Sequence, residues 1–249
     1  MTNTIRNHPL TSFYIITFIM SFILLMGHFI LPDVGYYSLS FTQFAPGIAV
    51  LVLAYFYSIK TSFHFSAPTI KHGFLALAIP SVLVMISAYL MFLLGFDFVP
   101  WKGDGLFYAL SFIAIFMGCI AEEIGWRGFL LKCLQIKSSA FKSSLIVGLL
   151  WGIWHLNFTG GLMGFILYTI TIIEMSICMT WLYNRTEGNL VLMSIWHIAF
   201  NLTSHIFLWE RFNLQLFMVE SVVFGLLSIF LLIYDRKTFF RKPMIEAFK

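Results

Sequence analysis

The chain has 249 residues, of which 60% are hydrophobic and 10% are charged, and its formal net charge is +4. Soluble globular proteins have about 45–50% apolar and about 25% charged residues, so this composition excludes an ordinary soluble domain. The Lys and Arg residues are scattered over short polar stretches and the C-terminal tail. We therefore expect a lipid bilayer, and not nucleic acid, as the surface that this chain meets.

Eight apolar segments approach the length of a membrane-spanning helix, which is about 20 residues. In chain order they are 10–31, 41–59, 73–96, 106–131, 142–158, 161–183, 189–209 and 214–234. They are too long for barrel strands and do not alternate strictly between apolar and polar residues. The sequence therefore predicts an all-α protein, a polytopic transmembrane helical bundle with about eight spans.

The distribution of basic residues predicts the orientation. An even number of spans places both termini on one side of the membrane, and that side holds twelve of the 15 Lys and Arg residues. Only Lys102 and Arg211 fall in the opposite loops. Because cytoplasmic loops are enriched in Lys and Arg, both termini are expected in the cytoplasm.

The first polar motif is AEEIGWRGFL, which places three formal charges directly after an apolar run. Ionisable groups inside spans are costly and are candidates for a functional site. Glu123 and Arg127 are four residues apart and should pair on one helix face. Glu122 is left without a local cation, and Gly118 and Gly125 on its face leave room for a neighbouring helix or water. The alternative is that all three charges form a packing network or line a solute pathway.

Two further polar pairs follow at the same spacing. Trp151 and His155 share one face of the fifth segment, and His197 and Asn201 share one face of the seventh. If the fourth and fifth segments form a hairpin that turns near KSSA, Glu122 and His155 lie at similar depth. At about 1.5 Å per residue, His197 reaches a similar layer, so three helices are expected to bring polar groups together.

These residue types suit hydrolysis. A carboxylate in a low-dielectric cavity is a stronger base, so Glu122, helped by His155, could take a proton from water. His197 and the Asn201 amide could donate hydrogen bonds to the developing oxyanion. A route without any cofactor competes with a zinc route, in which Glu122, His155 and His197 would leave an open position for water. The sequence lacks an H-E-x-x-H signature, and residue types do not decide between the two routes.

At these motifs the sequence resembles the CPBP family, the CAAX proteases and bacteriocin-processing enzymes, also called the Abi family. That family carries Glu-Glu-x-x-x-Arg, then aromatic-x-x-x-His, then His-x-x-x-Asn on a multi-helix membrane core. Here EEIGWR begins at Glu122, WGIWH ends at His155 and HIAFN begins at His197. The resemblance covers about residues 105 to 205.

The resemblance implies a CAAX-protease-like core and an intramembrane endopeptidase. By analogy with the family, Glu122 and His155 activate water, and His197 and Asn201 hold the oxyanion. The family has been described both as glutamate proteases and as metalloproteases, so the analogy leaves zinc as the alternative cofactor.

The same analogy assigns Glu123 and Arg127 to the support of the site. Eukaryotic members of the family remove the tail after a prenylated cysteine, whereas bacterial members are linked to peptide maturation and bacteriocin self-immunity. This small chain looks bacterial. A hydrophobic peptide or a lipid-anchored protein at the cell membrane is therefore the expected substrate.

Three parts are expected along the chain. Residues 1–104 hold about three N-terminal transmembrane helices, residues 105–210 form the CPBP-like catalytic core, and residues 211–249 form a final helix and a basic cytoplasmic tail. Two other classes of function stay open. A non-catalytic immunity or scaffold protein has no need of so many costly intramembrane polar groups. A small-solute transporter with a proton relay would usually show an inverted repeat and paired broken helices, which this sequence lacks.

Overall fold

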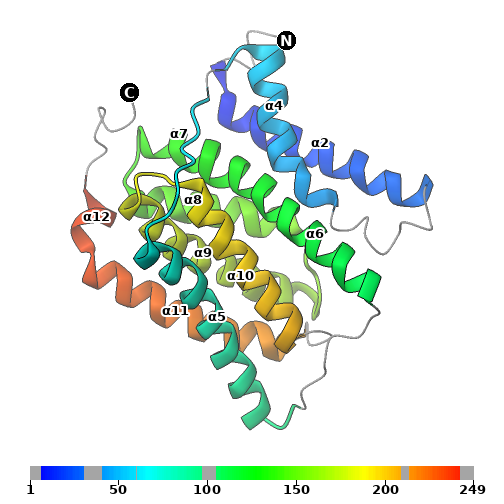
Figure 1. Cartoon of the computed structure of the whole chain (residues 1–249), viewed down its shortest axis with the longest axis vertical. Helices are drawn as coiled ribbons and strands as arrows, with labels where there is room; N and C mark the ends of the chain where they lie inside the picture. The colour runs from blue at the N-terminus through cyan, green and yellow to red at the C-terminus, as the bar shows by residue number, and fades with distance from the viewer. Residues whose placement is uncertain (1–6, 31–40, 60, 97–104, 209–212, 242–249) are drawn as a thin grey trace.

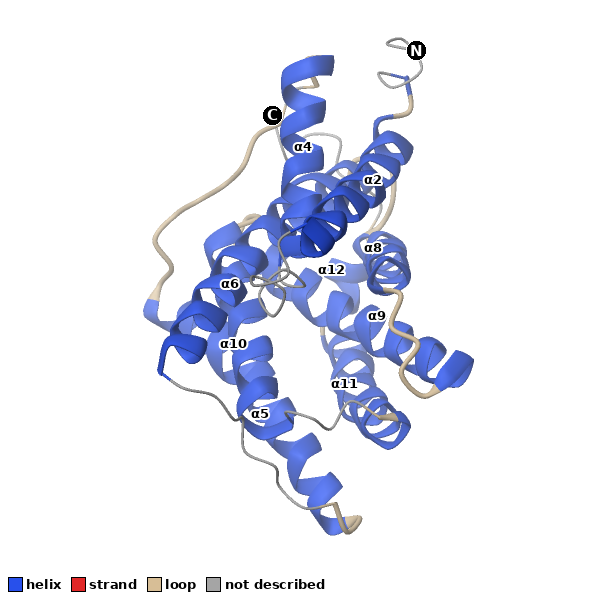
Figure 2. Ribbon diagram, turned by 90° about the vertical axis from the view of Figure 1, so that its right-hand side faces the viewer, coloured by secondary structure: helices blue, strands red, loops and turns tan. Residues whose placement is uncertain are grey.

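The computed structural model describes residues 7–30, 41–59, 61–96, 105–208 and 213–241, which form a bundle of helices (Figure 1). Within these ranges no strand is formed, and Figure 2 shows only helices and loops. A single isolated bridge joins His64 and Asn189. The predicted all-α class is confirmed.

Each of the eight predicted segments is helical. The first four are α2 (Pro9–Ile30), η2 with α4 (Thr42–Phe44 and Ala45–Tyr57), α5 (Ile70–Leu93), and a helical rod made of α6 (Gly105–Glu123), the π-helical η3 (Ile124–Leu131) and α7 (Lys132–Gln135). The others are α8 (Ala140–His155), α9 (Gly161–Arg185), α10 (Leu190–Leu208) and α11 (Leu214–Tyr234), and a short α12 (Arg236–Phe240) follows.

Six of the helical segments are long and apolar enough to cross a membrane. The second and fifth segments have only 16 residues each, Thr42–Tyr57 and Ala140–His155, whereas a span needs about 20. The chain is thus a multi-pass membrane protein, and the count of eight spans stays a prediction. Lys102 and Arg211 lie outside the described residues, as do parts of both predicted domain boundaries, so orientation and domain limits also stay predictions.

Helices suit this chain because a membrane offers no water to bond exposed backbone groups. The polar loops still provide conventional caps. The side chains of Thr69, Ser139 and Asn213 each accept a hydrogen bond from the backbone N–H three residues later, at the starts of α5, α8 and α11. These caps satisfy donors that the first turn of a helix leaves free.

The outer surface of the bundle is apolar, as expected for contact with lipid. Leu226 and Ile233 of α11 are 67% and 73% exposed, and Leu51 of α4 is 65% exposed. A soluble monomer rarely exposes large contiguous apolar patches. The exposed faces therefore agree with a helical bundle that lies in a bilayer.

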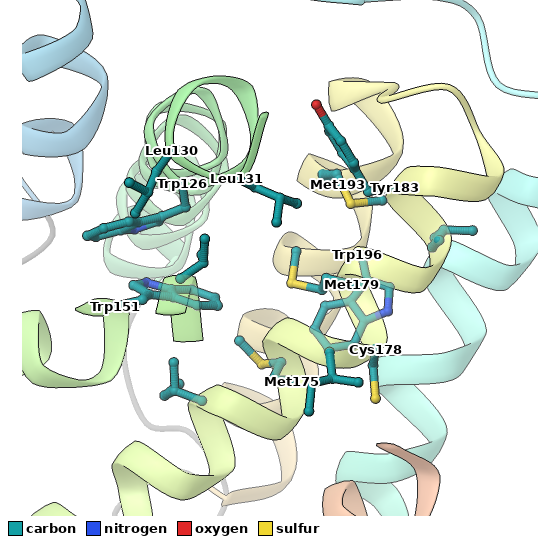
Figure 3. Close-up of a cluster of buried hydrophobic side chains, with 14 of the residues drawn as sticks. Trp126, Leu130, Leu131, Trp151, Met175, Cys178, Met179, Tyr183, Met193 and Trp196 are labelled. Atoms are coloured by element: carbon teal, nitrogen blue, oxygen red, sulfur yellow. The ribbon is translucent and has the colours of Figure 1, made fainter. Parts of the chain in front are cut away.

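Most helices pack around α9 and α10. α9 packs against α8 and α11, and α10 packs against α5 and α6. α2 and α4 lie side by side at one end of the molecule in both views. In the core, Trp126, Trp151 and Trp196 are fully buried. Figure 3 shows Trp126 and Trp151 on one side of a buried cluster and Trp196 with several methionines on the other.

The loop between α4 and α5 is tied to the turn between α9 and α10. The backbone N–H of Leu190 donates to the His64 carbonyl at 2.9 Å, and the Asn189 side chain donates to the Ser66 carbonyl at 3.0 Å. Lys132 donates to the Ser62 carbonyl at 2.8 Å. This loop therefore fixes the α7 end of the helical rod against the neighbouring helices.

Candidate active site

The acidic motif lies where the rod changes its helical geometry. Glu122 and Glu123 are the last residues of α6, and Arg127 lies within the π-helical η3. All three side chains are 0% exposed. π-Helical turns are rare and are often found at functional sites. Here the altered geometry begins directly after the two carboxylates.

The Glu123 carboxylate accepts hydrogen bonds from two side chains. Its Oε1 accepts from Arg127 at 2.9 Å, which is the i, i+4 pair that the spacing predicted, and from His197 Nδ1 of α10 at 2.8 Å. Pairing of this kind lowers the cost of holding charges away from water. The contact also fixes the His197 ring, so that Nδ1 is occupied and Nε2 is the nitrogen left for chemistry.

Arg127 also contacts residues of two other helices. Its guanidinium carbon lies 4.2 Å from the centroid of the Trp151 ring, and a second guanidinium nitrogen lies 3.0 Å from the Met179 sulfur of α9. A guanidinium over an indole face is favourable, and more so when both are desolvated. Arg127 therefore links the rod to both α8 and α9.

Glu122 is held by Trp151 of α8. The indole Nε1 donates to Glu122 Oε2 at 2.7 Å. The other carboxylate oxygen, Oε1, is buried and makes no well-formed hydrogen bond within the described residues, although the Trp126 indole N–H, which also lacks one, interacts with this carboxylate at longer range. A buried oxygen of this kind calls for an explanation, and an ordered water that bonds to it would be one.

His155 is the last residue of α8 and is partly buried. Its Nδ1 lies 2.8 Å from the Trp151 carbonyl, which leaves Nε2 as the reactive nitrogen. In the hydrogen bonds of the described residues, Glu122 and His155 are each joined to Trp151 and not to one another. The two predicted water activators thus both contact Trp151, Glu122 through its indole N–H and His155 through its backbone carbonyl.

Asn201 lies one turn beyond His197 on α10 and is partly buried. Its amide nitrogen lies 3.2 Å from the sulfur of Cys119, and its backbone carbonyl accepts from His205 at 2.7 Å. A thiol is a weak acceptor. The Asn201 amide is therefore a donor that a stronger acceptor, such as an oxyanion, could capture.

The helical rod meets η2 and α4 through its glycines, as the sequence predicted. A Cβ atom at Gly118 would collide with the carboxamide of Gln43, and one at Gly125 would approach the backbone carbonyl carbon of Pro46 to 2.9 Å. The missing side chains therefore allow a second helical segment to lie against the acidic motif.

Sequence reasoning missed two residues of the site. Trp151 was identified as the aromatic residue of a motif, but its hydrogen bond to Glu122 was not foreseen. Gln43 carried no signal, because it is an isolated amide in an apolar segment. The position of Trp151 four residues before His155 was the one available clue.

A zinc site was the alternative for these residues. Within the described residues no three His, Cys, Asp or Glu side chains are grouped so that they could hold a metal ion. Glu122, His155 and His197 do not form such a group.

Comparisons with known proteins identify the matching segment. Residues 104–203 match the model of a family described as Type II CAAX prenyl endopeptidase Rce1-like. CAAX prenyl protease 2 of Methanococcus maripaludis is 27% identical over 158 residues, which are 59% of this chain and 54% of that protein. Lysostaphin resistance protein A of Staphylococcus aureus is 26% identical over 157 residues, which are 60% of this chain and 37% of that protein.

This chain therefore spans about half of the first relative's length and a smaller share of the second. The matched segment holds all three motifs, from Glu122 to Asn201. The resemblance to the CPBP family of CAAX endopeptidases is confirmed for this part of the chain.

Proposed function

We propose that this multi-pass membrane protein is an intramembrane endopeptidase, because residues 104–203 match the model of the Rce1-like CAAX endopeptidase family. Its proposed substrate is a hydrophobic peptide or a lipid-anchored protein, cleaved at the membrane. One observation carries the proposal. Glu122 is fully buried, one of its oxygens is fixed by Trp151, and the other makes no well-formed hydrogen bond within the described residues.

The proposed mechanism starts at Oε1 of Glu122. This oxygen takes a proton from a water molecule, and His155 Nε2 helps to orient and deprotonate the same water. The resulting hydroxide attacks the scissile carbonyl carbon. A carboxylate in a site that excludes bulk water is well suited to this role as a base.

His197 and Asn201 then stabilise the tetrahedral intermediate. In the imidazolium form, His197 can donate from Nε2 while its Nδ1 stays bonded to Glu123. The Asn201 amide nitrogen leaves its weak contact with Cys119 to donate to the oxyanion. Removal of a single donor of this kind typically costs about 10²–10³ in kcat. The proton on Glu122 or His155 passes to the leaving amine.

The biological setting is proposed from the same resemblance. A bacterial cell membrane with both termini in the cytoplasm agrees with the charge distribution. Peptide maturation or bacteriocin self-immunity would each use cleavage of a short apolar peptide. One relative is named for resistance to lysostaphin.

The test is Glu122→Gln, which keeps the shape of the side chain and removes the base. Glu174→Gln is the matched control, since Glu174 is a second intramembrane glutamate on α9 that lies against Gly225 of α11. Secreted and membrane peptides are compared by mass spectrometry between cells that carry each variant, and cleavage of a responsive peptide is then measured with purified protein.

We expect Glu122→Gln to abolish cleavage with unchanged folding, and Glu174→Gln to retain it. Retention of the full peptide profile in Glu122→Gln cells would favour the non-catalytic or transport classes of function. A chelator separates the route without a cofactor from the zinc route. Cleavage is measured after the chelator is added, and the metal content of the same sample is determined. Persistent cleavage without bound zinc is expected for the route described above.

A further inference from the structure

A cavity of about 440 Å³ lies between α2, η2 and the C-terminal end of α8. Its volume falls within the range of about 300–1,000 Å³ that is typical of ligand pockets. His155, one of the proposed water activators, lines this cavity together with its neighbours Trp154 and Leu156. The cavity therefore reaches one of the four proposed catalytic residues.

One wall of the cavity is an apolar face of α2. Phe18, Phe22 and Leu25 line it at i, i+4 and i+7, so they lie above one another on the same side of the helix. Phe22 is 61% exposed although its ring is large and apolar. α2 is held in position against α8 by a hydrogen bond of 2.8 Å from Trp154 Nε1 to Ser21 Oγ.

Gln43 of η2 brings a polar group to the same cavity. Its side chain lies against Gly118, one helical turn before Glu122. Its carbonyl oxygen Oε1 is buried, and no donor within the described residues bonds to it. An unpaired buried acceptor is costly, so turning Oε1 away from Gly118 into the cavity would allow it to accept a hydrogen bond from an amide N–H of a bound peptide.

We propose that this cavity binds the substrate peptide next to the bond that is cleaved, an inference that rests on the proposed peptidase function. A large aliphatic or aromatic side chain of the peptide packs against Phe18, Phe22 and Leu25. Gln43 Oε1 accepts a hydrogen bond from a backbone N–H of the same peptide. A backbone amide beside an apolar side chain is what a peptide presents and a bare lipid chain lacks.

The cavity combines two parts of the chain that differ in their relation to known proteins. His155 belongs to the segment that matches the family model, residues 104–203, whereas Gln43 and the α2 residues precede it. The N-terminal helices would therefore set which peptide is cleaved, while the core performs the chemistry.

The first test measures selectivity. Peptides that differ in one side chain next to the cleaved bond, Ala, Leu or Trp, are compared by kcat/KM for wild type, Phe22→Ala and Leu25→Trp. Differences of one or two carbon groups in an apolar pocket change kcat/KM by about tenfold or more. We expect Phe22→Ala to shift preference toward Trp and Leu25→Trp to shift it toward Ala.

Ile23→Ala is the matched control, because Ile23 is 54% exposed on the same helix and does not line the cavity. This substitution should leave unchanged the ratio of kcat/KM for the Leu peptide to kcat/KM for the Trp peptide. Thermal unfolding of each variant verifies folding, and the two pocket variants shift preference in opposite directions, so general destabilisation cannot imitate the result. Unchanged ratios in both pocket variants would overturn the assignment.

The second test addresses Gln43. Each non-scissile backbone N–H near the cleaved bond is replaced by an ester oxygen, and the loss in kcat/KM is measured for wild type and Gln43→Ala. At one position we expect the ester to lower kcat/KM of wild type about two- to tenfold, the size of one hydrogen bond. The same ester should leave kcat/KM of Gln43→Ala unchanged. Equal losses in both proteins at every position would overturn the role of Gln43. Absence of peptide cleavage by the purified wild-type protein, by contrast, would contradict the peptidase function itself.

Discussion

Replacing Trp151 with Phe tests the centre of the proposed site. The substitution keeps an aromatic ring but removes the N–H that donates to Glu122 Oε2 at 2.7 Å. Glu122 is 0% exposed, so bulk water does not replace the lost donor. A hydrogen bond to a charged group contributes about 1.5–3 kcal/mol. If all of this is lost from the transition state, kcat falls about ten- to 150-fold, since about 1.36 kcal/mol is a factor of ten.

The assay is the cleavage of a responsive peptide by purified protein in lipid vesicles, with kcat and KM determined separately. Trp196→Phe is the control, because Trp196 is also 0% exposed and loses the same atoms. Its ring stacks on Phe200 at 6.2 Å. We expect Trp151→Phe to lower the melting temperature more than Trp196→Phe, because it also leaves Glu122 Oε2 without its donor, and we expect Trp151→Phe alone to lower kcat strongly.

Equal effects of the two substitutions on kcat would refute this reasoning. Trp151 would then fill space like any buried aromatic residue, and its contact with Glu122 would have no catalytic consequence. An unchanged kcat in Trp151→Phe would lead to the same conclusion, provided that the variant is folded.

Three other predictions concern stability. Arg127→Met should destabilise the protein by about 3–5 kcal/mol, because it removes the arginine partner of a buried carboxylate and leaves Glu123 with His197 alone, and adding Glu123→Gln should restore part of the loss in thermal unfolding. Gly125→Ala should cost about 1–3 kcal/mol by overpacking against α4, whereas Gly27→Ala, with nothing within 4 Å, should not destabilise; equal melting temperatures would contradict the close approach. Although burial raises the pKa of Asp235, hydrogen bonds and the charge of the arginine of α9 hold it below its ordinary value of 3.8. The Asp235–Arg185 pair should therefore stabilise the fold at neutral pH and cease to do so as the pH falls through the folded-state pKa of Asp235, so the melting temperatures of wild type and Asp235→Asn should converge in acid, below the ordinary pKa of 3.8.

The sequence by itself determined the class of protein and the local features of the site. Apolar runs of membrane length specify helices, because helices satisfy their own backbone groups in lipid. The Glu123–Arg127 pair was predictable because both partners lie on one helix, where spacing alone decides contact. The glycines of the rod predicted a close neighbour for a similarly local reason, the absence of side chains on one face.

Only the tertiary structure decided how the helices share these residues. The contact of Glu122 with Trp151, that of His197 with Glu123, and the place of Gln43 against Gly118 depend on the rotation and depth of separate helices. A periodic pattern does not specify these quantities, because several packings bury the same apolar faces. The π-helical turn after Glu123 adds to this, since it changes the angle between successive residues from the α-helical value on which sequence reasoning relies.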